Sequence, residues 1–232
     1  MLAKLFTEQF AFSKGDSVVV IGLGRFGSAV AQSLMRLGHD VMGIDRDSEP
    51  VQYWADLLTH AVQADSTNVN VMRQLGVADF SHAVVGIGTD LAASLMTIMA
   101  LTELGIKDIW VKALTAEHGQ ISQRIGAHHV VYPEADMGER VAHLITGRMM
   151  DFIEFDDGFA IAKIHAPAPT HNHALSESGV REKFGVTVVG VKRANEDFQH
   201  ATPSTRILPG DMLIVSGPTP KIELFAGGTK KQ

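Results

Sequence analysis

The sequence predicts an α/β protein in which a doubly wound parallel sheet is followed by a small α+β domain. Three observations lead to this prediction. Short apolar runs alternate with helix-like segments from Ser17 to about Val131, a glycine-rich turn follows the first run, and after Gly138 the runs become shorter and are joined by tight turns. Strands that alternate with helices imply a mainly parallel sheet covered on both faces.

The first domain is expected to hold six strands and the helices between them. Segments 28–37 and 91–104 carry apolar residues on one face at helical spacing, and a glycine follows each. The expected strands are short runs bounded by polar or turn residues, at 17–21, 40–44, 60–63, 82–87, 109–112 and 129–132.

The second domain is expected to be a separate α+β module. Segments 152–155 and 159–165 flank the turn Asp156–Asp157–Gly158, which is typical of a β-hairpin. Residues 175–184 are expected to form a short helix, and 186–192 and 212–215 two more strands. We therefore divide the chain into an N-terminal extension (1–16), a first domain (17–135), a connecting helix (136–150, clearly helical from 139) and a C-terminal domain (151–228).

The composition limits the classes of function. Of 232 residues, 45% are hydrophobic and 20% are charged, as in ordinary globular proteins. The net charge of −6 argues against nucleic-acid binding, and the absence of cysteine rules out disulfides and thiolate chemistry. No signal peptide or apolar run of membrane-spanning length is recognisable, so we expect a cytoplasmic protein that reaches a membrane only through a partner. The extension contains Phe6 and Phe10 and could dock on such a partner; a disordered tail is the equal alternative.

The glycine-rich turn lies between a strand and a helix, as a Rossmann-like phosphate-binding turn requires. Gly22, Gly24 and Gly27 have the spacing GxGxxG. The first glycine permits the tight turn, the second lets a pyrophosphate approach the backbone, and the third lets the helix pack close to the strand. The phosphate would then lie at the positive end of the helix dipole.

An acidic residue stands where a ribose-binding carboxylate is expected. Asp45 ends the second strand, 18 residues after Gly27. Arg46 follows it and could clamp a 2′-phosphate, but the retained Asp45 argues against a phosphorylated ribose. The spacing therefore predicts a nucleotide with a free ribose diol.

The turn also contains a cation. Arg25 could fork onto phosphate oxygens, which suits a ligand with terminal phosphates such as ATP or ADP; a solvated surface charge is the alternative. We count Phe26, the next residue of the turn, with the same binding segment.

Other polar groups follow the remaining strands at the same carboxyl edge, where open parallel sheets bind ligands. Each of them could instead cap the helix that follows, with Ser66 or Thr67 before segment 68–75 and Thr89 or Asp90 before Leu91. For Asp65 and Thr89, capping and ligand contact are equally weighted. The candidates are Asp65, Ser66, Ile87, Gly88, Thr89 and Lys112.

The sequence gives little support to an enzyme. A dehydrogenase needs a substrate domain with an acid/base group over the nicotinamide, and the short second domain has no obvious pair of this kind. An NAD(P)-dependent oxidoreductase and a redox-sensing transcriptional regulator remain as alternatives, although no basic helix-turn-helix is visible for the latter.

Several segments together resemble the RCK (regulator of potassium conductance) family, and within it the Ktr- and Trk-type subunits of bacterial potassium uptake. The resemblance covers about residues 17–148 and more loosely the second domain. It is carried, in chain order, by VVVIGLGRFGSAVAQSL, GID, QADST, VVGIGTD, IWVKA, VYPEADMG, VREKFGVTVVGVKR and LPGDMLIVSG.

The resemblance implies a gating function. It implies a homodimer that assembles into an octameric ring beneath a membrane potassium channel subunit of the KtrB or TrkH type. It implies ATP or ADP, and in some members NAD(H), at the first domain, with phosphate contact from Arg25, ribose contact from Asp45 and further contacts from Lys112 and His118.

Two further sites are implied by the resemblance. Glu134 is expected to help bind a divalent cation or Na⁺ between nucleotides; a solvated acid at a helix start is the alternative. Some relatives bind cyclic di-AMP in the second domain, and the corresponding segment here contains Val180, Arg181 and Phe184.

Overall fold

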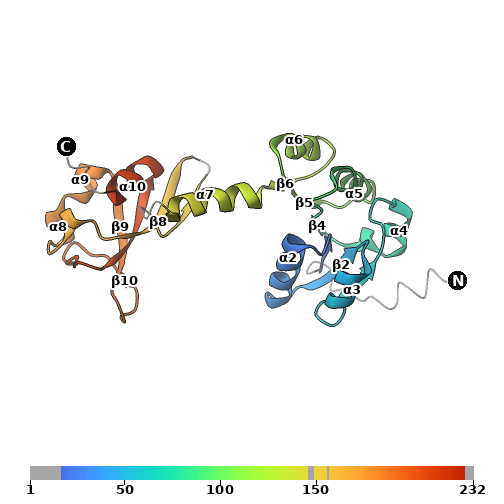
Figure 1. Ribbon diagram of the computed structural model, residues 1–232, viewed down its shortest axis with the longest axis horizontal. Helices are drawn as coiled ribbons and strands as arrows, with labels where there is room; N and C mark the ends of the chain where they lie inside the picture. The colour runs from blue at the N-terminus through green and yellow to red at the C-terminus, as the bar shows by residue number, and fades with distance from the viewer. Residues whose placement is uncertain (1–16, 146–148, 156, 228–232) are drawn as a thin grey trace. The chain divides into compact units, whose positions relative to one another are not determined.

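The computed structural model describes residues 17–145, 149–155 and 157–227, and the chain divides into two compact units between Glu134 and Ala135 (Figure 1). The N-terminal extension 1–16, Asp156 of the hairpin turn, part of the connecting segment and the last residues lie outside the described part.

The first unit is built on a parallel sheet with the strand order β3-β2-β1-β4-β5-β6 (Figure 1). All neighbouring strands pair in parallel. The strands are β1 (Ser17–Ile21), β2 (Asp40–Asp45), β3 (His60–Gln63), β4 (His82–Val85), β5 (Asp108–Lys112) and β6 (His129–Val131). The predicted α/β class and all six strands are confirmed. The fourth strand is shorter than expected because Gly86 already belongs to the turn that packs on Gly22.

The helices of this unit follow the strands in alternation. They are α2 (Arg25–Arg36), α3 (Ser48–Trp54), α4 (Val69–Gln74), a 3₁₀ turn η1 (Val77–Asp79), α5 (Leu91–Glu103) and α6 (Ala116–Arg124). The first helix begins three residues earlier than the predicted segment 28–37, because Gly24 is its N-cap residue. As a result, the last three residues of the glycine motif form the first turn of α2.

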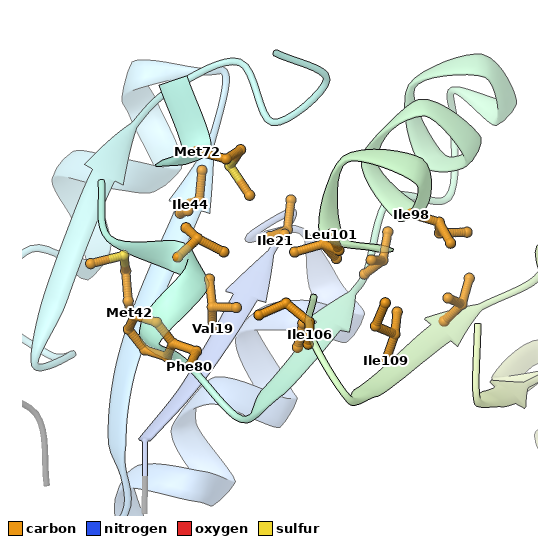
Figure 2. Packing of buried hydrophobic residues seen from close by; sticks show 14 of the residues in the cluster. Val19, Ile21, Met42, Ile44, Met72, Phe80, Ile98, Leu101, Ile106 and Ile109 are labelled. Carbon is orange, nitrogen blue, oxygen red and sulfur yellow. The ribbon is translucent and has the colours of Figure 1, made fainter. Parts of the chain in front are cut away.

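Two apolar clusters cover the two faces of the sheet. In β1, Val19 and Ile21 belong to one cluster, which includes Met72 of α4 and Ile98 of α5 (Figure 2). The alternate residues Val18 and Val20 belong to the other cluster, which α2 covers. Since successive side chains of a strand point to opposite faces, this split is what a sheet buried on both sides requires.

The second unit contains an antiparallel sheet with the order β10-β9-β11-β8-β7 (Figure 1). Its strands are β7 (Asp151–Glu154), β8 (Phe159–His165), β9 (Thr187–Lys192), β10 (Gln199–His200) and β11 (Met212–Pro218). The predicted hairpin is confirmed, since β7 and β8 pair antiparallel with Ile153 opposite Ile161.

The helices of the second unit differ from the prediction in three ways. Instead of spanning 139–150, α7 runs from Pro133 to Ile145, and proline is favoured as a first helical residue. The single helix expected at 175–184 is two helices, α8 (Leu175–Ser178) and α9 (Val180–Phe184), because Gly179 has the left-handed φ of 61°. The third, α10 (Thr219–Ala226), was not predicted, although its Ile222 and Phe225 lie in the core of this unit.

Candidate functional site

The three glycines of the turn meet three different steric conditions. Gly22 has φ +88°, which disfavours any other residue. A Cβ on Gly27 would lie 1.9 Å from the carbonyl oxygen of Gly22, so this position tolerates no side chain. A Cβ on Gly24, in contrast, would meet nothing within 4 Å. Gly24 therefore exposes its backbone to open space, as the approach of a phosphate requires.

A pocket of about 780 Å³ opens at the carboxyl ends of β1, β2 and β4. Its size suits a nucleotide, since ligand pockets commonly measure about 300–1,000 Å³. The predicted residues that line it are Gly22, Gly24, Arg25, Phe26, Asp45, Arg46, Asp65, Ser66, Ile87, Gly88, Thr89 and Lys112. Gly27, His118 and Glu134 do not line it. The pocket also includes Met96 and Pro50, which were not singled out from the sequence, and Asp90, which was considered only as a helix cap.

The carboxylate of Asp45 is held in place by the backbone. Its Oδ2 accepts a hydrogen bond from the N–H of Leu23 at 2.7 Å, and its Oδ1 accepts one from the N–H of Asp47 at 3.0 Å. Each oxygen keeps a second lone pair for a ligand donor. The side chain is thus positioned to accept hydrogen bonds from the two hydroxyls of a ribose.

Two cationic side chains lie near the glycine turn. Arg25 is exposed at the start of α2 and lines the pocket. Lys112, at the end of β5, is only 12% exposed; its Nζ lies 2.5 Å from Oε1 of Glu134 and 5.8 Å from the centre of the Phe26 ring. A Cβ on Gly88 would lie 3.3 Å from this Nζ, which places the ammonium at the wall of the pocket.

Glu134 contacts Lys112 but does not line the pocket. The hydrogen bond from Lys112 is the main cause that lowers the pKa of Glu134; desolvation opposes it, and the charges of Lys112 and Arg25 make smaller contributions that lower it further. Among the described residues, no group of three His, Asp or Glu side chains could hold a metal ion. A cation at Glu134 would therefore need oxygen ligands from outside these side chains, such as nucleotide phosphates.

Of the capping residues suggested by the sequence, Asp90 is confirmed at α5, whereas α4 is capped by Asn68 and not by Ser66 or Thr67. Asn68 caps α4 by accepting from the N–H groups of Asn70 and Val71, and Asp90 caps α5 by accepting from that of Ala93. Asp65 accepts from the N–H and the hydroxyl of Thr67, and these two bonds lower its pKa. Ser66, Thr67 and Thr89 are therefore not the caps of these helices.

His118 is buried away from the pocket. It lies in α6 with 5% of its surface exposed, and its Nε2 is 3.2 Å from the hydroxyl of Ser94. Burial lowers its pKa, so the ring is neutral near pH 7. In this structure His118 braces α5 against α6.

The residues proposed for cyclic di-AMP all lie in α9. Val180 is 4% exposed and belongs to the core of the second unit. Phe184 is half-buried, with its ring centre 5.0 Å from that of Phe225. Of these three side chains, that of Arg181 is the exposed one.

The fold and the pocket together define a class of protein. The strand order, the glycine turn and an acid at the end of the second strand are those of a Rossmann-type nucleotide-binding domain. Here it is joined to a small α+β domain.

Comparison with known proteins identifies the family. The TrkA-N domain model matches residues 18–133 and the TrkA-C domain model matches residues 159–226. The chain belongs to the RCK family, among the Ktr- and Trk-type regulators of potassium uptake. Among the described residues, none of the helices combines the length and the hydropathy that a membrane span requires.

The similarity to individual proteins extends over both domains. The chain is 36% identical to Ktr system potassium uptake protein C of Bacillus subtilis (strain 168), over 89% of this chain and 94% of that protein. It is 33% identical to Ktr system potassium uptake protein A of Vibrio alginolyticus, over 88% and 93%. Both relatives are thus matched over nearly their whole length.

Solved structures share the fold at lower identity. The RCK domain of GsuK superposes with a TM-score of 0.64 at 15% identity, covering 98% of this chain and 53% of that one. The GsuK channel bound to NAD gives a TM-score of 0.65 at 15% identity, covering 95% and 41%. A GsuK structure bound to ADP gives 0.50 at 14% identity, covering 59% and 36%. The chain spans about half of these channel chains or less.

Proposed function

We propose that this chain is the nucleotide-sensing gating subunit of a bacterial potassium-uptake channel, and that it switches between ATP- and ADP-bound conformations. One observation carries the proposal: the pocket places the fixed carboxylate of Asp45, the open backbone of Gly24 and the cations Arg25 and Lys112 around one cavity. A ribose, a phosphate chain and its negative charge each have a partner there.

The ligand is an adenine nucleotide. GsuK, which shares the fold, has been solved bound to NAD and bound to ADP. These two ligands share the ADP moiety, which is the part that Asp45 and the glycine turn would hold. ATP and ADP are our first choice because Arg25 suits a terminal phosphate, and NAD(H) is the second.

The mechanism is differential binding. A ligand shifts a two-state assembly only by the difference between its affinities for the two shapes. ATP carries one more phosphate than ADP, and an Arg25 that reaches this phosphate across a dimer interface supplies such a difference. A cation beside Glu134, either divalent or Na⁺, would screen the paired phosphates.

The assembly that we propose is the one implied by the resemblance to the RCK family. Homodimers would form an octameric ring on the cytoplasmic face of the membrane, against a channel subunit of the KtrB or TrkH type. The chain is then a binding subunit and not an enzyme, and no step of the proposal requires an acid/base residue. Cyclic di-AMP at α9 stays a prediction that rests on Arg181.

Calorimetric titration of the full chain, stripped of nucleotide, tests the role of the pocket. Arg25→Ala should bind ADP nearly as the unaltered protein does and lose its preference for ATP, because only ATP has the additional phosphate. Asp45→Ala should lower the affinity for both ligands by about tenfold or more, because each complex loses the charge-assisted hydrogen bonds to the ribose. Equal losses for ATP and ADP in Arg25→Ala would remove Arg25 from the mechanism, and no affinity for any adenine nucleotide would end the proposal.

A further inference from the structure

An ion pair joins the two sides of the pocket mouth. Nη1 of Arg46 donates to Oδ2 of Asp90 at 3.3 Å, and both residues line the pocket. Arg46 follows β2 and Asp90 precedes α5, so the pair connects two segments that are 44 positions apart in the chain. Its side chains are 65% and 39% exposed, which places it on the solvent side. Exposed pairs of this kind add little to folding stability.

The pair crosses the carboxyl end of β1. In the strand order, β2 and β4 lie on opposite sides of β1, about 9.5 Å apart at two strand spacings. Both ends of the bridge are anchored. The carbonyl of Arg46 accepts from Nε2 of Gln63, and the other carboxylate oxygen of Asp90 caps α5 through the N–H of Ala93. The guanidinium is thereby held over the mouth of the pocket.

The position of the ribose determines which part of a nucleotide meets this bridge. The glycine turn takes the phosphates and Asp45 takes the ribose hydroxyls. Phosphate and base leave opposite ends of a ribose, so the base lies beyond Asp45, away from the turn. Arg46 follows Asp45 directly in the chain, and Arg46 and Asp90 both line the pocket.

The surroundings of Arg46 argue against a phosphate as its ligand. Its Nε lies 4.0 Å from Asp47, its Nη1 contacts Asp90, and its charge also acts on Asp65. An additional 2′-phosphate would be repelled by these carboxylates, because all of these groups are negatively charged. An uncharged aromatic base has no such conflict, and a planar guanidinium stacks well on an aromatic face.

We propose that Arg46, held in place by Asp90, is a base clamp that lies against the purine ring of the bound nucleotide and makes the pocket select purine over pyrimidine bases. This inference rests on the proposed function and names the part of the ligand that is recognised. Asp90 acts through Arg46 and is a positioning residue.

Titration of the full chain with ADP and CDP tests the clamp, because the two ligands have the same ribose and phosphates. The unaltered protein should prefer ADP. Arg46→Ala should lose about tenfold in ADP affinity and much less in CDP affinity, since stacking on a guanidinium is stronger for the larger ring. Arg46→Lys should behave like Arg46→Ala, because an ammonium keeps the charge but has no plane.

Two further variants separate the clamp from general effects. In Asp90→Asn the amide oxygen can still cap α5, but the carboxylate that holds Arg46 is gone, so the ADP-to-CDP ratio should fall while the melting temperature stays. Arg73→Ala breaks the pair of Arg73 with Glu103, which also has a 3.3 Å contact and exposed side chains but does not line the pocket. That variant should leave both affinities unchanged.

The outcomes decide between the two proposals. An unchanged ADP-to-CDP ratio in Arg46→Ala, with ADP still bound by the unaltered protein, overturns the clamp alone. Restoration of the ratio by Arg46→Lys shows a charge effect and also overturns it. Titration of Arg46→Ala with NADPH provides another check: a loss of affinity confined to NADPH would identify Arg46 as a reader of the 2′-phosphate and would also overturn the clamp. If the unaltered protein binds neither ADP nor CDP, the proposed function and the clamp fall together.

Discussion

At the scale of single residues, the glycine turn separates the needs of the fold from those of the ligand. Gly27 has the carbonyl oxygen of Gly22 where a Cβ would be, so it is required for close packing of α2 on β1. Gly24 has open space at the same point and lines the pocket. The two glycines should therefore respond differently to the same substitution.

Gly27→Ala is expected to destabilise the folded protein by about 1–3 kcal/mol, because the added methyl forces the turn apart. Gly24→Ala should destabilise by at most about 1 kcal/mol, because its φ of −70° suits any residue and only the N-cap preference for glycine over alanine is lost, yet it should weaken nucleotide binding. Urea unfolding and calorimetric titration of both variants give the two quantities. Full nucleotide affinity in Gly24→Ala would show that no phosphate approaches this backbone.

His118 makes the stability of the first unit depend on pH. Burial lowers its pKa in the folded state below the unfolded value of about 6.5. The unfolded chain therefore takes up a proton more readily, so the stability is complete above about pH 6.5 and decreases as the pH falls towards the folded-state pKa. Burial also lowers the pKa of His60, against a smaller opposing effect of Asp40, which adds to the same trend.

His118→Gln is expected to reduce this loss, because an amide can still hydrogen-bond to Ser94 but does not titrate between pH 5 and 7. One group contributes at most about 1.4 kcal/mol per pH unit. Melting temperatures of both proteins from pH 8 to pH 5 provide the measurement, with pH 8 as the reference for the cost of the substitution itself. Parallel curves would mean that His118 does not titrate differently in the two states.

The candidate site was predictable from the sequence where one local rule fixes a residue. Parallel strands end at one edge, so Asp45, Asp65 and Lys112 could be assigned to that edge before the strand order was known. The contact of Arg46 with Asp90 could not be predicted in this way, because it depends on β2 and β4 flanking β1. The burial of His118 likewise depends on how α5 packs against α6.

At the scale of helices and strands, predictability follows burial. The strands of the first unit were predicted because parallel strands, covered on both faces, are short apolar runs. Helix α3 has no buried residue and hence no apolar stripe from which its position could be predicted. The boundary within 175–184 was missed because the amphipathic pattern continues through Gly179, while the backbone there turns left-handed. One signal for α10 was overlooked: a proline in its first turn, before Ile222 and Phe225.

Two glycine substitutions in helical segments are expected to have opposite effects on stability. Gly179→Ala should destabilise the second unit by about 1 kcal/mol or more, because φ is +61° and the added Cβ would lie 3.1 Å from the side chain of Lys183. Gly138→Ala, in the exposed interior of α7 with no atom within 4 Å of the new Cβ, should stabilise by up to about 1 kcal/mol. Denaturant unfolding compares them, and stabilisation by Gly179→Ala would show that one continuous helix forms there.

At the scale of the whole molecule, the chain has separate cores on the two sides of Glu134. The two clusters of the sheet of the first unit contain no residue of the second unit, whose own core is formed around Ile164, Leu213 and Phe225. All residues that line the nucleotide pocket belong to the first unit. The ligand should therefore stabilise one unit directly, and the other only as far as the two are coupled.

Scanning calorimetry with and without ADP measures this coupling. At 100 times its Kd, a ligand that binds only the folded state adds about 2.7 kcal/mol, which should raise the melting temperature of the first unit by about 10 °C. The transition of the second unit should move much less, because all the residues that line the pocket belong to the first unit. Hydrogen exchange should assign the shifted transition to residues 17–134, and the variant Asp45→Ala, with a weakened site, should show a smaller shift. A single transition that moves as a whole would mean that the two cores unfold together. In that case nucleotide binding to the first unit would also stabilise the second unit.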